Sequence, residues 1–309
     1  MSFLEQVEIG TGAWQWGDKL VWGFKNAGGE ADALAAFEAS IDAGVPFIDT
    51  AELYGFGTSE KIIGKALRAE REKAAPRTTY IASKILPWPW RVSRGQFRRA
   101  LRGSLNRLGL SKVDLYQIHM PSLTMSPEAY AEALAEALSE NLIGAAGVSN
   151  YRREAVIRSH HTLEQRGHAL ASNQVEYHLL NRSIERDGTM AACKERGVKI
   201  IAYSPLSQGL LTGKYTPENP PPGVRKRMYA GKLPKIAPLI ALMREIGAKH
   251  GDKTPAQVAL NWCICKGTIP IPGARNAQQV RSNAGAVGWR MTDDEVAALD
   301  AISAQIEGT

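Results

Sequence analysis

The amino-acid sequence predicts an α/β protein folded as a (β/α)8 TIM barrel. Eight short apolar runs alternate along the chain with segments whose apolar residues recur at helical spacing. The runs are apolar throughout, as expected for parallel strands buried on both faces. Eight such strands separated by helices favour a closed barrel over an open sheet. A length of 309 residues suits one such barrel, so residues 1–309 are expected to form a single domain.

The elements follow from the spacing of apolar residues and from capping signals. The expected strands are residues 7–12, 45–49, 79–83, 113–118, 145–148, 172–175, 198–203 and 268–271. The expected helices are residues 30–42, a helix that Ser59 can cap, and residues 93–108, 126–141, 152–164, 183–196 and 254–266. Pro127 and Pro255 directly follow Ser126 and Thr254, which predicts a cap followed by proline in the first helical position.

Two segments exceed the minimal barrel. Residues 206–234, after the seventh strand, form a long loop rich in glycine and proline that leads into an extra helix at residues 236–249. Residues 292–303 form a tail helix after the eighth unit. Connections as long as the first are usually functional in a compact domain.

Composition narrows the class of ligand. The chain carries 38 Lys and Arg against 31 Asp and Glu, a net charge of +7, but the basic residues are dispersed and the densest cluster is residues 225–227. This pattern argues against nucleic acid and favours a small anionic ligand. The three cysteines are not at zinc-ligand spacing, so no metal is expected. We expect a cytoplasmic protein, because the sequence shows no secretion signal and no apolar run of about 18 residues.

Polar residues that end neighbouring strands predict an active site. Asp49 ends the second strand, Lys84 the third and His119 the fourth, while Tyr54 lies in the loop after the second. In a barrel, the carboxyl ends of the strands surround the active site. Lys84 is expected to lower the pKa of the Tyr54 phenol toward the working pH, and His119 to donate a hydrogen bond to a carbonyl oxygen. This set suits proton donation to a carbonyl group that receives a hydride.

The hydride donor is not expected on a Rossmann fold. Gly10 and Gly12 begin a G-x-G-x-x-G pattern, but Gln15 stands where the third glycine belongs. The alternative is a phosphate site at the last strands of the barrel. Residues 271–279 run from the eighth strand into a helix, and Arg275 in this loop could pair with a phosphate.

The sequence as a whole resembles the aldo-keto reductases. The resemblance lies in eight collinear motifs: Phe47-Ile48-Asp49-Thr50-Ala51-x-x-Tyr54-Gly55, Ser83-Lys84, Gln117-Ile118-His119-x-Pro121, Gly147-Val148-Ser149-Asn150, Asn173-Gln174-Val175-Glu176-Tyr177, Tyr203-Ser204-Pro205-Leu206, Gly209-Leu210-Leu211-Thr212-Gly213-Lys214-Tyr215 and Ile271-Pro272-Gly273-Ala274-Arg275. The Gly-Leu-Leu-Thr-Gly-Lys loop resembles the branch with potassium-channel β subunits, bacterial general reductases and pyridoxal reductases. Gln208 departs from this branch, where a small residue is more usual.

The resemblance implies an NADPH-dependent reductase of aldehydes or ketones. It assigns Tyr54 as general acid, Asp49 and Lys84 as the groups that tune it, and His119 as the group that orients the carbonyl. It implies that the long loop after the seventh strand covers the cofactor, and that Arg275 selects NADPH over NADH. The cofactor-binding residues that it implies are Gly12, Ala13, Trp14, Asp49, Ser149, Asn150, Gln174, Tyr203, Ser204, Pro205, Leu206, Gly209, Leu211, Lys214, Gly273, Arg275, Gln279 and Asn283.

The substrate pocket is expected to be aromatic. Trp22, Trp88, Trp90 and Tyr151 fall on loops near strand ends, which suits flat or apolar carbonyl compounds, although loop tryptophans can also serve only as packing anchors. The expected partner is a small molecule, with the chain a monomer or weak homo-oligomer. Two other functions stay open: a slow or non-catalytic NADPH-binding regulatory subunit, and a lyase that forms a Schiff base on Lys84.

Overall fold

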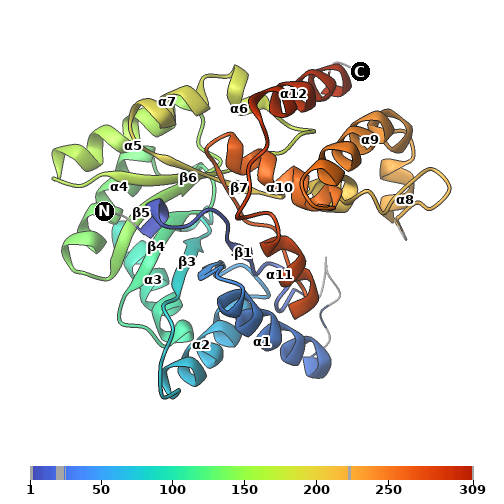
Figure 1. Cartoon of the computed structure of the whole chain (residues 1–309). Coiled ribbons are helices and arrows are strands. Elements are labelled where there is room, and N and C mark those ends of the chain that lie inside the picture. Colours follow the sequence, from blue (N-terminus) through green and yellow to red (C-terminus); the bar gives the residue numbers. More distant parts are fainter. Residues whose placement is uncertain (1–2, 19–23, 25, 222–223, 308–309) are drawn as a thin grey trace.

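Eight parallel strands form the centre of the molecule, and helices surround them (Figure 1). The computed structural model describes residues 3–18, 24, 26–221 and 224–307. The sheet runs in sequence order from β1 to β8, which confirms the predicted barrel. The strands are β1 Thr11–Gly12, β2 Phe47–Asp49, β3 Tyr80–Ile85, β4 Val113–Ile118, β5 Ile143–Ser149, β6 Leu170–Glu176, β7 Lys199–Tyr203 and β8 Ile269–Pro270.

The barrel closes between its first and last strands. The Gly10 N–H donates to Pro270 O and the Gly12 N–H to Pro272 O, each at 3.0 Å. A Cβ atom on Gly12 would lie 2.9 Å from the main-chain oxygen of Ile271, so this close approach requires glycine. Pro270 and Pro272 have no N–H to donate, which is one reason why β8 is shorter than the expected residues 268–271.

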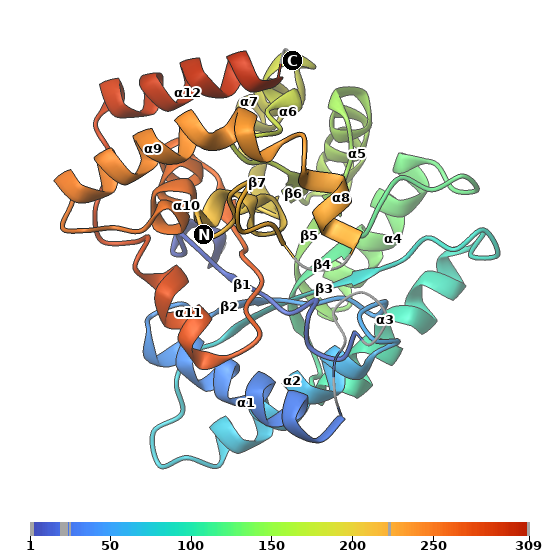
Figure 2. The same cartoon turned by 90° about the vertical axis from the view of Figure 1, so that its right-hand side faces the viewer.

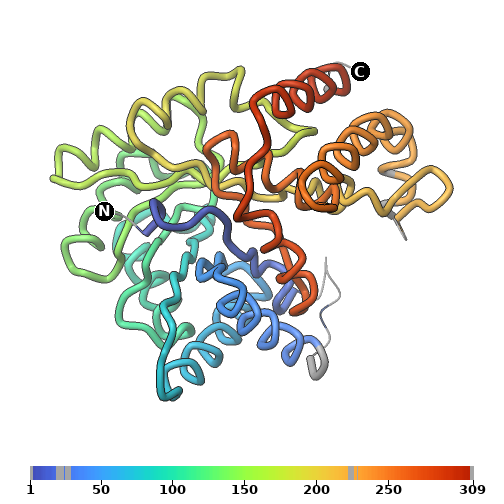
Figure 3. The backbone as a smooth tube through the Cα atoms, in the orientation of Figure 1, coloured from blue at the N-terminus to red at the C-terminus, as the bar shows by residue number. Residues whose placement is uncertain are grey.

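Most helices lie where the sequence predicts them. They are α1 Asn26–Asp42, α2 Thr58–Arg71, α3 Arg94–Leu108, α4 Pro127–Ser139, α5 Arg153–Gln165, α6 Ser183–Arg186, α7 Thr189–Glu195, α8 Val224–Tyr229, α9 Leu233–Lys249, α10 Pro255–Cys265, α11 Ala277–Ala284 and α12 Asp293–Glu307. Ser126 and Thr254 cap α4 and α10 with proline next in the chain, as predicted. The two added helices α9 and α12 lie together on one side of the barrel (Figures 2 and 3).

Three expectations differ from the structure. The expected helix at residues 183–196 is divided into α6 and α7 at Gly188, whose φ of 80° breaks the helical path. The loop at residues 206–234 contains a 3-10 helix, η2 Ser207–Thr212, and α8. Ser59 is not a cap: Gly57 precedes α2, and the buried Ser59 hydroxyl lies 2.8 Å from that of Thr50.

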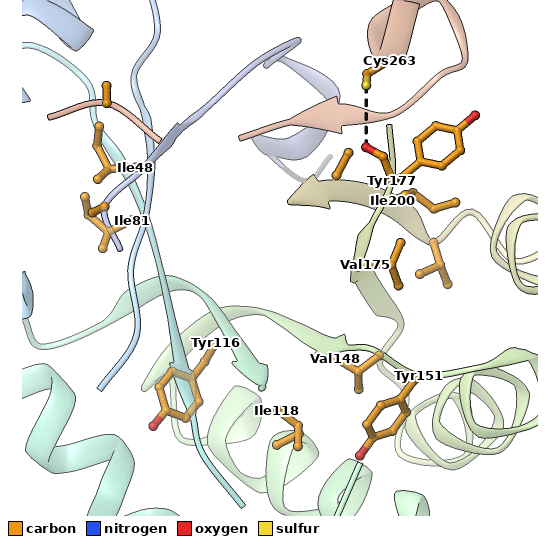
Figure 4. Packing of buried hydrophobic residues seen from close by; sticks show 14 of the residues in the cluster. Ile48, Ile81, Tyr116, Ile118, Val148, Tyr151, Val175, Tyr177, Ile200 and Cys263 are labelled. Carbon is orange, nitrogen blue, oxygen red and sulfur yellow. Dashed lines mark hydrogen bonds between the residues drawn. The ribbon is translucent and has the colours of Figure 1, made fainter. Parts of the chain in front are cut away.

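Strand alternation separates an outer apolar layer from an inner one. Side chains such as Ile48, Tyr116 and Val175 face the surrounding helices (Figure 4). Their neighbours along the strands, among them Phe47 and Leu115, form a separate cluster inside the barrel.

The amino end of the barrel is covered by the N-terminal segment. Phe3, in the 3-10 helix η1 Phe3–Glu5, stacks on Tyr80 with ring centroids 4.6 Å apart and meets Phe47 edge-on at 5.3 Å. Tyr80 and Phe47 are the first residues of their strands. This packing leaves the carboxyl ends of the strands as the open end, where the predicted site lies.

Candidate active site

Three of the four predicted catalytic residues form one hydrogen-bonded chain. The Lys84 ammonium donates to Asp49 Oδ1 at 2.5 Å, to Thr50 O at 2.9 Å and to the Tyr54 hydroxyl at 3.3 Å. These three contacts use all three of its N–H groups. Lys84 is 0% exposed and Asp49 is 1% exposed, so the ion pair is shielded from water. It is held by adjacent strands, since Asp49 ends β2 and Lys84 lies in β3.

Two amides satisfy the second oxygen of the Asp49 carboxylate. Asp49 Oδ2 accepts from Gln174 Nε2 at 2.8 Å and from Gln117 Nε2 at 3.3 Å. All of these residues point into the barrel from β2, β4 and β6, directly above its apolar interior. Sequence reasoning gave Gln117 no role. The available signal was its position two residues after Leu115 on the inward side of β4.

The Tyr54 phenol keeps its proton at neutral pH. Burial raises the pKa of Tyr54 above its ordinary value, the Lys84 charge opposes this rise and the Asp49 charge adds to it. The prediction that Lys84 brings the phenol pKa down toward working pH is therefore wrong in its net direction. Burial also disfavours the Lys84 ammonium, but Asp49 and Tyr54 outweigh burial and raise the Lys84 pKa, so this side chain stays charged.

His119 stands beside Tyr54 as a neutral imidazole. Its ring meets the Tyr54 ring edge-on, with centroids 5.7 Å apart and an interplanar angle of 79°. Burial lowers the pKa of His119 to about 3, and the Lys84 charge lowers it further in the same direction. His119 Nδ1 is buried and has no hydrogen-bond partner within the described residues. A neutral ring can donate one hydrogen bond and accept one.

A cluster of amide and hydroxyl groups lies next to this chain. Asn150 adopts a left-handed φ of 59°, and its Nδ2 donates to His119 O at 3.2 Å and to Ser149 Oγ at 3.1 Å. Its Oδ1 accepts from the Tyr203 hydroxyl at 3.1 Å. The structure thus brings together Ser149 and Asn150, at the end of β5, with Tyr203, at the end of β7.

The loop after β7 has an unusual main chain. Ser204, Ser207 and Gln208 adopt φ values of 51°, 46° and 53°, and Gly209 follows at 98°. Such runs of left-handed residues are rare outside functional sites. Gln208 Oε1 accepts from the Tyr229 hydroxyl of α8 at 2.8 Å, which ties this loop to the helix that follows it. Leu206 is partly buried against the core, and Lys214 is exposed, with its ammonium 4.7 Å from the Tyr215 ring centre.

The segment after β8 enters α11 through a side-chain cap. Asn276 Oδ1 accepts from the Gln279 N–H at 3.0 Å, and Gln279 Oε1 accepts from the Arg275 N–H at 2.8 Å. Arg275, Gln279 and Gly273 are exposed, and Asn283 lies one helical turn beyond Gln279. The exposed guanidinium beside a capped helix N-terminus fits an anionic group such as a phosphate.

Some predicted cofactor residues are enclosed. Gly12, Ala13, Pro205 and Leu211 are buried. The predicted set as a whole fits a phosphorylated nicotinamide cofactor. The Asn150 amide contacts the main chain of the neutral His119, the left-handed loop follows β7, and the exposed Arg275 precedes α11.

The predicted substrate-pocket residues divide into three groups. Trp88 and Trp90 stack on each other with centroids 4.8 Å apart and an interplanar angle of 8°, and Trp90 is 63% exposed. Trp22 lies outside the described residues. Tyr151 is 2% exposed and packs in the outer core layer (Figure 4), which argues against a place for its ring in the substrate pocket. Its sequence position just beyond β5 gave no sign that the side chain turns outward.

Trp14, predicted to bind the cofactor, lies beside Tyr54. Its ring centroid is 6.2 Å from that of Tyr54, and the side chain is 37% exposed. Its indole N–H donates to Asp18 Oδ2 at 2.9 Å. Trp14 thus combines a partly exposed ring with a position beside Tyr54.

Two features are absent from the part of the chain that the structure describes. None of its helices has both the length and the apolar character required to cross a bilayer. Among the described residues, no group of three or more His, Cys, Asp or Glu side chains is arranged to hold a metal ion.

Comparison with known proteins gives consistent matches over the whole chain. The model of the aldo/keto reductase family matches residues 8–304. A chloroplastic pyridoxal reductase of Arabidopsis thaliana is 37% identical over 308 residues, which cover 97% of this chain and 84% of that protein. The aldo-keto reductase str7 of Strobilurus tenacellus is 33% identical over 287 residues, covering 89% of this chain and 82% of that protein.

Solved structures show the same barrel. A glycerol dehydrogenase from Gluconobacter oxydans superposes with a TM-score of 0.83 at 28% identity, covering 98% of this chain and 93% of that one. An aldo/keto reductase from Klebsiella pneumoniae, in complex with NADP and acetate, has a TM-score of 0.73 at 29% identity, covering 96% and 91%.

Proposed function

Because this chain belongs to the aldo/keto reductase family and is an NADP-dependent oxidoreductase, we propose that it reduces an aldehyde or ketone to an alcohol with Tyr54 as the general acid. The observation that carries the proposal is the chain of contacts from Asp49 through Lys84 to the Tyr54 hydroxyl. We also propose that residues 1–309 act as one domain, since a single sheet runs through all eight strands.

The cofactor supplies a hydride from its reduced nicotinamide ring when it is bound. We propose that Ser149, Asn150 and Gln174 hold the nicotinamide carboxamide and that Tyr203 stacks under the ring. The remaining contacts would come from β1 and the turn after it, the end of β2, the loop after β7, and α11 with the segment before it: Gly12, Ala13, Trp14, Asp49, Ser204, Pro205, Leu206, Gly209, Leu211, Lys214, Gly273, Arg275, Gln279 and Asn283. Gln174 donates to Asp49, so this amide would link the ring site to the ion pair.

The residues around Tyr54 have different roles in the proposed proton transfer. Tyr54 holds a proton that it can give to the carbonyl oxygen as negative charge develops there. The fixed Lys84 charge stabilises the phenolate that remains, and Asp49 keeps the lysine charged and oriented. His119, neutral over the physiological range, can donate a hydrogen bond to the same carbonyl oxygen without competing as an acid.

The same electrostatics argue against the lyase alternative. A Schiff base requires a neutral amine, whereas Asp49 and Tyr54 raise the pKa of Lys84 and keep it an ammonium. The regulatory alternative has no specific feature in its favour, because the groups needed for reduction stand in contact.

The proposed substrates are flat aromatic carbonyl compounds, with pyridoxal among them. The exposed stacked pair Trp88 and Trp90 and the ring of Trp14 support this class, since aromatic faces bind flat rings well. The 37% identity to a protein named as a pyridoxal reductase supports the choice of pyridoxal as a probe.

The test is a spectrophotometric assay of NADPH oxidation with pyridoxal, aromatic aldehydes and quinones. We expect turnover by the wild-type chain. Tyr54→Phe should lose at least about a thousandfold in kcat, because it removes both the proton donor and a hydrogen bond to the oxyanion. NADPH should still quench the tryptophan fluorescence of this variant. A fully active Tyr54→Phe enzyme would refute the mechanism, and cofactor binding without turnover on any carbonyl compound would favour a regulatory subunit.

A further inference from the structure

A partly buried ion pair joins the loop that carries Tyr54 to the loop that carries the two tryptophans. Glu52 lies two residues before Tyr54, and its side chain is 11% exposed. Both of its carboxylate oxygens accept from the Arg91 guanidinium, Oε1 from Nη1 and Oε2 from Nη2, the latter at 3.1 Å. Glu52 Oε1 also accepts from the Leu86 N–H at 2.8 Å. Such two-point pairing fixes orientation as well as distance.

The same arginine closes the loop after β3. Arg91 Nη1 donates to Leu86 O at 2.7 Å, and the Arg91 N–H donates to Trp88 O at 2.8 Å. The Trp88 N–H donates to Leu86 O at 2.9 Å. Pro87 and Pro89 restrict the φ angles on either side of Trp88, so the loop has little freedom left. The stacked tryptophans are therefore fixed to the Glu52 side chain through a short, cross-braced loop.

The tryptophan pair belongs to an exposed apolar rim. Every exposed large hydrophobic side chain among the described residues lies on a loop that follows one of the first four strands: Trp14, Phe56, Trp90, Val92, Met120 and Leu123. A tryptophan that served only as a packing anchor would bury its ring, whereas Trp90 stays 63% exposed although its partner ring lies parallel to it. The exposed face offers a surface on which a flat ring can stack.

We propose that Glu52 and Arg91 are positioning residues that hold the stacked Trp88 and Trp90 rings in a fixed orientation relative to Tyr54, and thereby select flat aromatic over aliphatic carbonyl substrates. This inference rests on the proposed reductase function. Preorganisation of a binding surface improves affinity by removing the entropy that a loop would otherwise lose on binding. Loss of the ion pair should therefore affect substrates that stack on the tryptophans and leave the proton chemistry at Tyr54 in place.

The test compares Glu52→Gln, Arg91→Met and Arg91→Lys with the wild-type chain at saturating NADPH. Glu52→Gln removes the charge with little change of shape, and Arg91→Lys keeps the charge without the two-point geometry. Arg94→Met is the matched control, because the Arg94–Glu136 pair of α3 and α4 is exposed. The probes are 2-naphthaldehyde as a flat aromatic substrate and hexanal as an aliphatic one.

We expect Glu52→Gln and Arg91→Met to raise the KM for 2-naphthaldehyde about tenfold while the KM for hexanal and both kcat values stay within about twofold. Arg91→Lys should recover part of the loss, and Arg94→Met should behave as wild type. The exciton signal of the stacked tryptophans in circular dichroism should weaken in parallel. An equal rise in KM for both aldehydes, or a weakened exciton signal with an unchanged KM for 2-naphthaldehyde, would overturn the proposal.

A second measurement separates this proposal from the proposed function. Quenching of tryptophan fluorescence by 2-naphthaldehyde measures binding without turnover. The dissociation constant obtained from it should be about tenfold higher for Glu52→Gln than for wild type. If the wild-type chain reduces no carbonyl compound, the proposed function fails while this measurement still decides the role of the ion pair. Equal quenching in the two proteins would refute that role.

Discussion

The Lys84→Met variant should expose how much of the fold depends on the charge pair in the active site. Lys84 donates three hydrogen bonds from a fully buried position, and Asp49 would remain 1% exposed without its cation. Removing one partner of a buried ion pair typically costs about 3–5 kcal/mol, out of a total folding free energy of about 5–15 kcal/mol. We therefore expect Lys84→Met to lose about 3–5 kcal/mol of unfolding free energy.

Urea unfolding followed by fluorescence measures this loss, and two further variants interpret it. The double variant Asp49→Asn/Lys84→Met removes both charges, so it should be more stable than the single variant Lys84→Met. Lys65→Met is the matched control, because Lys65 is 61% exposed in its pair with Glu30 and should change stability by less than about 1 kcal/mol. If Lys84→Met were as stable as wild type, or the double variant were no better than the single one, the buried charge would not be what Lys84 neutralises.

The remaining predictions concern cofactor charge and pH. Arg275→Ala should raise the KM for NADPH about 10- to 100-fold, the loss expected for one charged hydrogen bond, and leave the KM for NADH within about twofold; steady-state kinetics with both cofactors checks this, and equal rises would remove the argument for a phosphate contact. Because the pKa of His119 is about 3, the rate of carbonyl reduction should show no ionisation of this ring between about pH 5 and pH 8. Because the raised pKa of Tyr54 keeps the phenol protonated, reduction should decline only at a pH above the ordinary pKa of a tyrosine, whereas alcohol oxidation, which needs the phenolate, should rise with pH. A pH profile with a transition near neutrality that disappears in His119→Asn would contradict these assignments.

Sequence patterning predicted the features that depend on periodicity. The apolar runs and their spacing placed Asp49, Lys84 and His119 at adjacent strand ends, because parallel strands deliver their carboxyl ends to one face. The same reasoning could not assign Gln117, since its role depends on strand register across the barrel and on which oxygen of Asp49 is left unsatisfied. Tyr151 looked like a mouth residue because only its distance from the strand end is visible in the sequence, not the direction of its side chain.

The pKa of Tyr54 shows a different limit of sequence reasoning. The presence of a lysine near a phenol was predicted correctly, and its electrostatic effect has the predicted sign. The net shift is a balance between that charge and burial, and burial is a property of the packed structure. The break at Gly188 is similar: glycine is compatible with a helix or with a left-handed turn, and the fold decides which.

The order of the site along the chain has a consequence for assembly. Asp49, Tyr54, Lys84 and His119 all come from the first four strands, whereas the left-handed loop and the capped helix with Arg275 come from the last two units. A fragment with the first half of the barrel would hold the proposed proton donor but few of the proposed cofactor contacts, and the other fragment would hold most of those contacts without the donor. A ligand that contacts both halves stabilises their union by mass action. NADPH would thus stabilise the association of the two half-barrels, and its binding would require that both are folded together.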